Sequence, residues 1–177
     1  AFTTATTPSI INVVDNGTYS GLITTPASNP QITINAPGAE FDGIYVLTGT
    51  TLYITAREIS PISGNSLQIT ATGNLVCKAN YIAGNILSEG GDVSIEVILM
   101  DGNVTSQAGD FAIEFDIING DFVTENTALK VNGGDLNGTI TMTYTGPDPS
   151  RLEGFIGNIS SAPIFDTGTG VFGTFGK

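Results

Sequence analysis

The sequence contains no histidine and no tryptophan, and it has a single cysteine. Without histidine, Ser-His-Asp and Cys-His catalytic arrangements and His-containing zinc sites are excluded. Cys77 has no partner for a disulfide within the chain, and the apolar residues before it predict a buried, unreactive thiol. No Gly-rich phosphate-binding loop followed by lysine is present. These absences remove the commonest catalytic arrangements.

Positive charge is also scarce, since five Lys and Arg stand against 17 Asp and Glu, which gives a net charge of −12. This charge repels phosphate backbones and anionic lipid headgroups, so we expect no nucleic-acid partner. No run of 18 apolar residues occurs, and we expect no membrane insertion. The first residue is Ala rather than Met, from which we expect that a leader has been removed. The prediction is a secreted, extracellular or cell-surface protein.

What the chain does contain is alternation of apolar and polar residues, clearest at 92–99, 111–118 and 138–145. Turn-forming residues separate the alternating segments, and Asn119-Gly120 between apolar runs predicts a type I′ hairpin. No segment carries an apolar stripe at helical spacing, and we expect no fixed repeat period. The pattern predicts an all-β fold, an antiparallel β-sandwich of jelly-roll or immunoglobulin-like type with about ten short strands.

Acidic residues concentrate between Glu89 and Glu125, where no Lys or Arg occurs. If the strands at 92–99 and 111–118 pair as a hairpin, Glu96 approaches Glu114 or Asp116, and like charges placed opposite each other are destabilising. Ca²⁺ prefers oxygen ligands and would offset this repulsion. The candidate Ca²⁺ ligands are Glu96, Asp101, Asp110, Glu114 and Asp116. The alternative, which we favour, is a solvated outer face that keeps the sheet soluble, with no cofactor.

Two further patterns allow an enzyme to be considered. Asp166-Thr167-Gly168 resembles the motif of aspartic proteases, but only nine residues follow it, too few to complete that fold. A turn before a final strand is the favoured interpretation. Two carboxylates could serve a glycosidase, but sugar subsites usually also have aromatic platforms, and tryptophan is absent. We therefore expect no enzymatic activity.

Four Asn-X-Ser/Thr sequons predict a glycoprotein. Their asparagines are Asn16, Asn103, Asn137 and Asn158.

The segment AFTTATTPSIINVV is a Thr-rich leader followed by β-branched apolar residues. Its apolar residues are Ile10, Ile11, Val13 and Val14. Both faces of this strand are apolar, which favours a strand inserted into a groove. We expect residues 1–16 to be an N-terminal extension and candidate donor strand, and 17–177 to be one sandwich domain. The open alternative is a local hairpin, in which residues 18–23 pair back on 10–14 across Asp15-Asn16-Gly17.

With this N-terminal segment, the chain resembles the secreted β-sandwich subunits of pili, threads and biofilm fibres that assemble by donor-strand complementation. The resemblance implies a structural subunit of an extracellular filament or surface assembly, with copies of itself as partners. Chaperone–usher pilins usually carry a disulfide, which one cysteine cannot form. The alternative is a monomeric secreted adhesion or carbohydrate-binding β-sandwich that contacts surface glycans, or a virion decoration protein.

Overall fold

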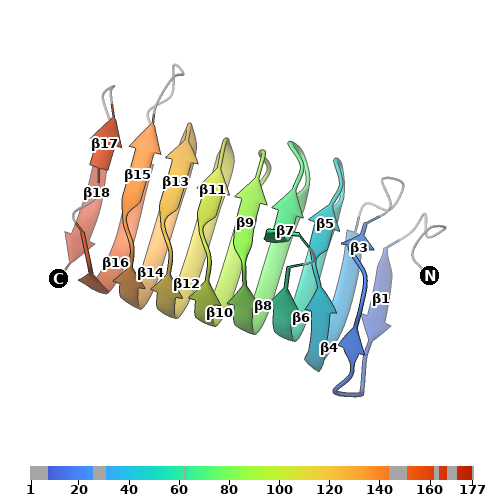
Figure 1. Cartoon of the computed structure of the whole chain (residues 1–177). Helices are drawn as coiled ribbons and strands as arrows, with labels where there is room; N and C mark the ends of the chain where they lie inside the picture. Colours follow the sequence, from blue (N-terminus) through green and yellow to red (C-terminus); the bar gives the residue numbers. More distant parts are fainter. Residues whose placement is uncertain are drawn as a thin grey trace.

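The fold is a parallel β-solenoid, in which the chain winds through successive coils around one core (Figure 1). The computed structural model describes residues 8–25, 31–61, 63–143 and 151–161, and the backbone of 164–166 and 171–176. Every pair of named strands in this part of the chain is parallel. The chain is all-β, but the predicted antiparallel sandwich is wrong.

Two sheets form the walls of the solenoid, and in each one a strand pairs with its counterpart one coil later. The first, called here the long sheet, contains β1 (Ser9–Asn12), β2 (Thr18–Tyr19), β4 (Gln31–Asp42), β6 (Thr51–Ser60), β8 (Asn74–Ala83), β10 (Val93–Asp101), β12 (Gly109–Asn119), β14 (Thr127–Asn137), β16 (Arg151–Ile159) and β18 (Val171–Gly176). The second, called the short sheet, contains β3 (Ile23–Thr24), β5 (Ile44–Val46), β7 (Asn65–Ile69), β9 (Asn85–Ser88), β11 (Val104–Ser106), β13 (Phe122–Glu125), β15 (Ile140–Thr143) and β17 (Ile164–Asp166). Figure 1 shows the coils side by side in chain order, from β1 at one end to β17 and β18 at the other.

The central coils repeat every 18 residues, which corrects the expectation that no fixed period exists. Ile95 lies opposite Cys77 on one side and Ile113 on the other, and Val131 follows in the next coil. Corner residues such as Asn85 and Asn103 are bonded across the same interval of 18. Parallel register therefore brings equivalent residues of successive coils into straight rows along the solenoid.

The core is built from the inward-facing rows. Side chains alternate between the two faces of a strand, so every second residue points into the solenoid, and these inward residues are mostly apolar. Each of them is covered by its row neighbours in the adjacent coils. Ile54, Cys77 and Ile95 form part of one such row, and each is 3% exposed or less. Phe111 and Phe122, from the long and the short sheet of one coil, are also fully buried. Burial of Cys77 is as predicted.

The predicted hairpins are corners of the solenoid. Asn119 is the last residue of β12, and Gly120 and Asp121 join β12 to β13, which belong to different sheets. The segment predicted to connect a hairpin between 92–99 and 111–118 contains β11, and β10 and β12 run parallel. Alternation with period two is the same in parallel and antiparallel strands, so it identifies the strands without giving their relative direction.

Polar side chains at one corner bond each coil to the next. The Asn85 Oδ1 accepts a hydrogen bond of 2.9 Å from the backbone N–H of Asn103, and the Asn103 Oδ1 accepts one of 2.9 Å from Asp121. The Asp121 Oδ1 in turn accepts the N–H of Thr139 at 2.8 Å. This corner ladder, formed by Asn85, Asn103, Asp121 and Thr139, satisfies backbone donors that the change of direction would otherwise leave unpaired.

Candidate functional site

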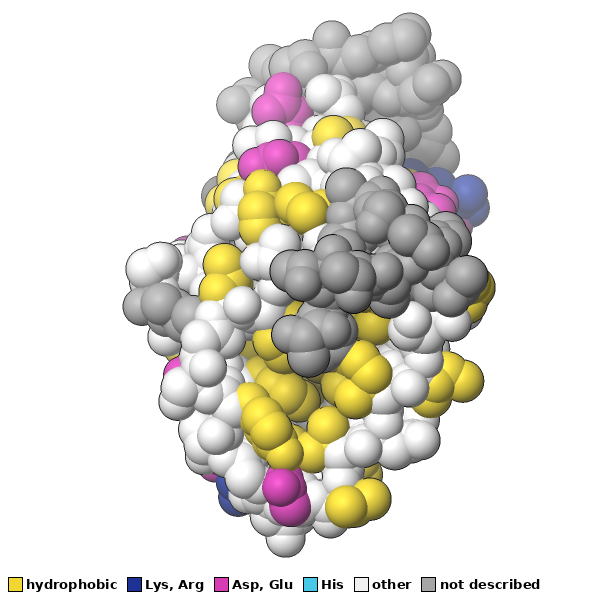
Figure 2. Space-filling model, turned by 90° about the vertical axis from the view of Figure 1, so that its right-hand side faces the viewer, with side chains coloured by type: hydrophobic (Ala, Val, Ile, Leu, Met, Phe, Trp, Pro, Cys, Tyr) yellow, Lys and Arg dark blue, Asp and Glu magenta, His cyan; other side chains and the backbone are white. Residues whose placement is uncertain are grey.

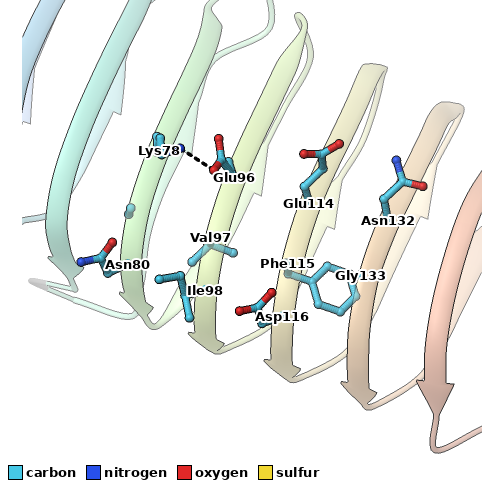
Figure 3. Close-up of a pocket in the computed structure, with 11 residues that line it drawn as sticks. Lys78, Asn80, Glu96, Val97, Ile98, Glu114, Phe115, Asp116, Asn132 and Gly133 are labelled. Atoms are coloured by element: carbon cyan, nitrogen blue, oxygen red, sulfur yellow. Dashed lines mark hydrogen bonds and ion pairs between the residues drawn. The ribbon is translucent and has the colours of Figure 1, made fainter.

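A shallow trough lies on the outer face of the long sheet, over β8, β10, β12 and β14 (Figure 3). Its lining residues are Lys78, Ala79, Asn80, Glu96, Val97, Ile98, Glu114, Phe115, Asp116, Asn132 and Gly133. Four of them form an outward row in register, with one polar side chain from each strand: Lys78, Glu96, Glu114 and Asn132. Below this row the Phe115 ring lies beside Gly133, where a Cβ atom would come within 2.6 Å of the ring. We call this hollow the outer trough.

The charges in the outer trough are unequally matched. The Lys78 Nζ lies 2.5 Å from the Glu96 Oε1, and both side chains are more than half exposed. Glu114 is the parallel neighbour of Glu96, and neither Glu114 nor Asp116 forms an ion pair with any residue that the structure describes. The predicted approach of Glu96 to Glu114 is therefore present, but parallel register produces it in place of a hairpin.

The remaining candidate Ca²⁺ ligands lie elsewhere. Asp101, at the end of β10, accepts hydrogen bonds from the Asn119 amide at 2.6 Å and the Tyr81 hydroxyl at 2.7 Å. These two bonds hold the pKa of Asp101 below its ordinary value, and the bond to Asp101 raises the pKa of Tyr81. Asp110 lies near the other end of the long strands, at the start of β12. Within the described residues, no group of three or more Asp, Glu, Cys or His side chains is placed to hold a metal ion.

The N-terminal segment lies in the first coil of its own chain. Residues 9–12 form β1, which pairs with β4 so that Ile11 lies opposite Ile34. The alternative of a local hairpin is wrong, because Thr18–Tyr19 pairs in parallel with β4 and not with β1. β1 belongs to the same sheet as strands of the segment 17–177 that was predicted to be a separate sandwich domain. Donation of this strand to another subunit stays a prediction.

The four candidate donor residues divide by face. Ile11 and Val13 pack partly buried against the core, whereas Ile10 is 71% exposed and Val14 is 99% exposed. The two inward residues form one side of an apolar groove at this end of the solenoid. The groove is lined by Ile11, Val13, Tyr19, Ser20, Gly21, Leu22, Ile23, Thr24, Ile34 and Phe41. We call it the end groove.

Figure 2 looks onto the end of the solenoid that carries β1, and hydrophobic side chains gather in the middle of this end with polar atoms around them. Tyr19 fixes one side of the end groove, because its ring stacks on Phe41 with a centroid distance of 5.5 Å. Its hydroxyl donates a 2.6 Å hydrogen bond to Asp15, which lowers the pKa of Asp15 and raises that of Tyr19. An apolar surface framed in this way is typical of an interaction site.

The four sequon asparagines are all exposed, but their side-chain amides make different contacts. Asn137 donates its amide N–H to Asn119 at 2.8 Å, and Asn158 donates to Asp135 at 2.6 Å. Asn103 uses its oxygen in the corner ladder. Asn16 packs beside Gly38, where a Cβ atom would meet its side chain at 1.9 Å. Their glycosylation stays a prediction.

The sequence interpretation missed the end groove and the corner ladder. The signal for the ladder is the recurrence of Gly followed by a polar residue every 18 positions, at 84–85, 102–103, 120–121 and 138–139. The groove has no comparable signal, because Leu22 and Ile23 become one of its sides only when the solenoid folds. The described residues contain no helix with the length and apolar character that a membrane span requires.

No protein-family model, curated protein or solved structure matches the chain.

Proposed function

We propose that this chain is a structural, rod-like part of an extracellular filament or surface assembly. The observation that carries the proposal is the uninterrupted pairing of the long sheet from β1 to β18, in which each coil pairs with the next, around a continuous apolar core. Such a solenoid is lengthened by adding coils without changing those already formed, because each coil contacts only its neighbours. The fold therefore supports a role in spanning distance.

The surface charge also favours this role. The net charge of −12 keeps the sides of neighbouring rods apart in solution. The outward row of the outer trough carries charged or amide side chains, which blunt the tendency of a sheet face to aggregate. Secretion is part of the proposal, and the sequence composition favours it.

Immunogold electron microscopy of cells that make the protein tests this function. The expected result is label on fibres or on the outer cell surface. Label confined to the cell interior would contradict the proposal. As a control, the same antibody is applied to permeabilised cells. This control distinguishes cells that lack the protein from cells in which the antibody cannot reach it.

A second candidate function, binding of surface glycans, is favoured by one specific arrangement. The outward row of the outer trough continues from Asn132 to Phe155, a residue that is 48% exposed and whose N–H donates to the Asn132 Oδ1 at 3.2 Å. A sugar ring could stack on the aromatic face while its hydroxyls bond to the neighbouring amide and carboxylates. Glycan-array binding that Phe155→Ala abolishes and Val123→Ala preserves is the expected result. Binding to no glycan, or equal loss in both variants, would contradict it.

A further inference from the structure

The end groove has the shape of a coil that lacks its neighbour. Inside the solenoid, Ile34 and Ile54 are 2% and 3% exposed, because coils on both sides cover them. Ile11 occupies the same row one coil earlier, yet it is only partly buried. Leu22, on the opposite side of the groove, is 54% exposed. Among the described residues, no strand lies beyond β1 in the long sheet or beyond β3 in the short sheet.

The backbone at this end also favours strand addition. The Val13 N–H donates to Asn35 at 2.8 Å, so Val13 and, by alternation, Ile11 direct their backbone groups toward β4. Ile10 and Asn12, which alternate with Ile11 and Val13, direct their backbone groups toward the outer edge of β1. An open parallel edge beside an apolar groove is suited to β-augmentation, in which main-chain hydrogen bonds supply affinity and the groove supplies contact area.

We propose that the end groove receives the opposite end of a second copy of this chain, so that β18 of one molecule extends the long sheet beyond β1 of the next. This inference rests on the proposed function and names its partner. All strands of the long sheet run in the same direction, so a copy moved along the solenoid axis presents β18 parallel to β1. A copy related by a twofold axis would present an antiparallel strand. Head-to-tail contacts of this type do not close, and they therefore build filaments.

Charge supports an end-to-end contact over a lateral one. No Lys, Arg, Asp or Glu side chain lines the end groove, although the chain as a whole carries a net charge of −12. Lateral contact between two copies would bring acidic faces together, whereas contact at the groove desolvates apolar surface with no ion to bury. The end of the solenoid is thus the surface on which self-association meets the least repulsion.

Sedimentation velocity over a range of concentrations, with negative-stain electron microscopy, tests this contact with two matched variants. Leu22→Lys places a charge in the end groove, and Val123→Lys places one on β13, where the side chain is 46% exposed on the short sheet. We expect the wild type and Val123→Lys to form rods that lengthen by whole subunits. We expect Leu22→Lys to associate at least about 100-fold more weakly, because the contact between copies would then bury an unpaired charge where the wild type buries a leucine side chain.

A second variant tests strand pairing separately from apolar contact. Ile10→Pro removes an N–H that faces away from β4, so it leaves the β1–β4 ladder intact while blocking a strand added outside β1. It should also weaken association, with an unchanged circular dichroism spectrum.

A wild type that is monomeric at every concentration would overturn the inference and would indicate that another segment covers the groove. Symmetric dimers that do not grow, or equal weakening by Leu22→Lys and Val123→Lys, would also overturn it. Failure of the proposed function is distinguishable, because rods of purified protein can form even where immunogold label is confined to the cell interior.

Discussion

The close stacking of coils at their glycine corners predicts a large effect for Gly109→Ala. Gly109 has a φ of +83°, in the left-handed region that favours glycine, and a Cβ atom there would lie 2.1 Å from the carbonyl oxygen of Gly91 in the preceding coil. Ordinary contact needs at least 3.4 Å. Because the contacted atom belongs to the backbone, the two coils must separate locally to admit the methyl group.

Gly49→Ala is the matched control, since Gly49 has a φ of +77° and nothing within 4 Å of its virtual Cβ. Both variants carry the conformational cost of about 1–2 kcal/mol for a left-handed residue. Both also gain about 0.4–1 kcal/mol because alanine restricts the unfolded chain. Only Gly109→Ala adds steric overlap, which we expect to lower the free energy of unfolding by about 1–3 kcal/mol relative to Gly49→Ala.

Urea denaturation followed by circular dichroism measures this difference. With an m-value of about 2 kcal/mol/M, the midpoint of Gly109→Ala should lie about 0.5–1.5 M below that of Gly49→Ala. Equal midpoints for the two variants would refute the close approach of Gly91 and Gly109, and with it the parallel stacking of these coils.

Three further predictions concern the ladder, an unpaired hydroxyl and the thiol. Asn103→Ala removes the acceptor for the N–H of Asp121 and should lower the free energy of unfolding by about 0.5–1.5 kcal/mol in urea titrations. Thr124→Val should raise the melting temperature, since the Thr124 hydroxyl is buried without a hydrogen-bond partner among the described residues and its removal should gain about 1 kcal/mol or more. Burial raises the pKa of Cys77 from 9.0 to about 12, so as pH rises above 9 the unfolded chain loses this proton first. Stability should therefore fall between pH 9 and 12, by at most about 4 kcal/mol from this group, and less steeply in Cys77→Val.

Each of these predictions has its own control. Asn103→Asp keeps the acceptor oxygen and should retain most of the stability, so a loss equal to that of the alanine variant would contradict the ladder. Thr127→Val removes a hydroxyl that is bonded to Ser106 and should destabilise, in contrast to Thr124→Val. For Cys77, a native thiol that reacts with a thiol reagent as fast as in urea would contradict its burial.

The strands and their inward faces were predictable from the sequence, but their direction was not. Alternation correctly places Ile95 and Ile113 inside, because a buried face requires an apolar residue at every second position in either type of sheet. Direction depends on how the corners turn, and Asn119-Gly120 has the composition of a hairpin turn although the chain there passes from β12 in one sheet to β13 in the other. The 18-residue period holds only from β8 to β14 in the long sheet and from β9 to β15 in the short sheet. The coils on either side are longer, since Thr51 lies opposite Asn74 and Ala128 lies opposite Arg151, each 23 positions away.

For the candidate sites too, the face of the strand on which a residue lies was predictable, but its neighbours in other strands were predictable only in part. The approach of Glu96 to Glu114 was predictable, because both lie on outward faces of neighbouring strands. Asp101 and Asp110 fall outside this group, since they lie near opposite ends of the long strands once β10 and β12 run parallel. Whether Ile11 contacts its own subunit or another depends on which strand lies beside it, and local pattern does not encode that choice.

The most direct test of the parallel solenoid is a set of distances between spin labels along one outward row. That row contains Tyr53, Val76, Ser94, Ala112, Lys130 and Glu153. The labels are attached to cysteines introduced at these outward-facing positions, because the native Cys77 is buried and inaccessible to the label. Neighbouring strands are about 4.8 Å apart. Backbone separations of about 19 Å from Tyr53 to Lys130 and about 24 Å from Tyr53 to Glu153 are predicted, from four and five steps of that spacing. Distances that do not increase coil by coil would contradict the solenoid.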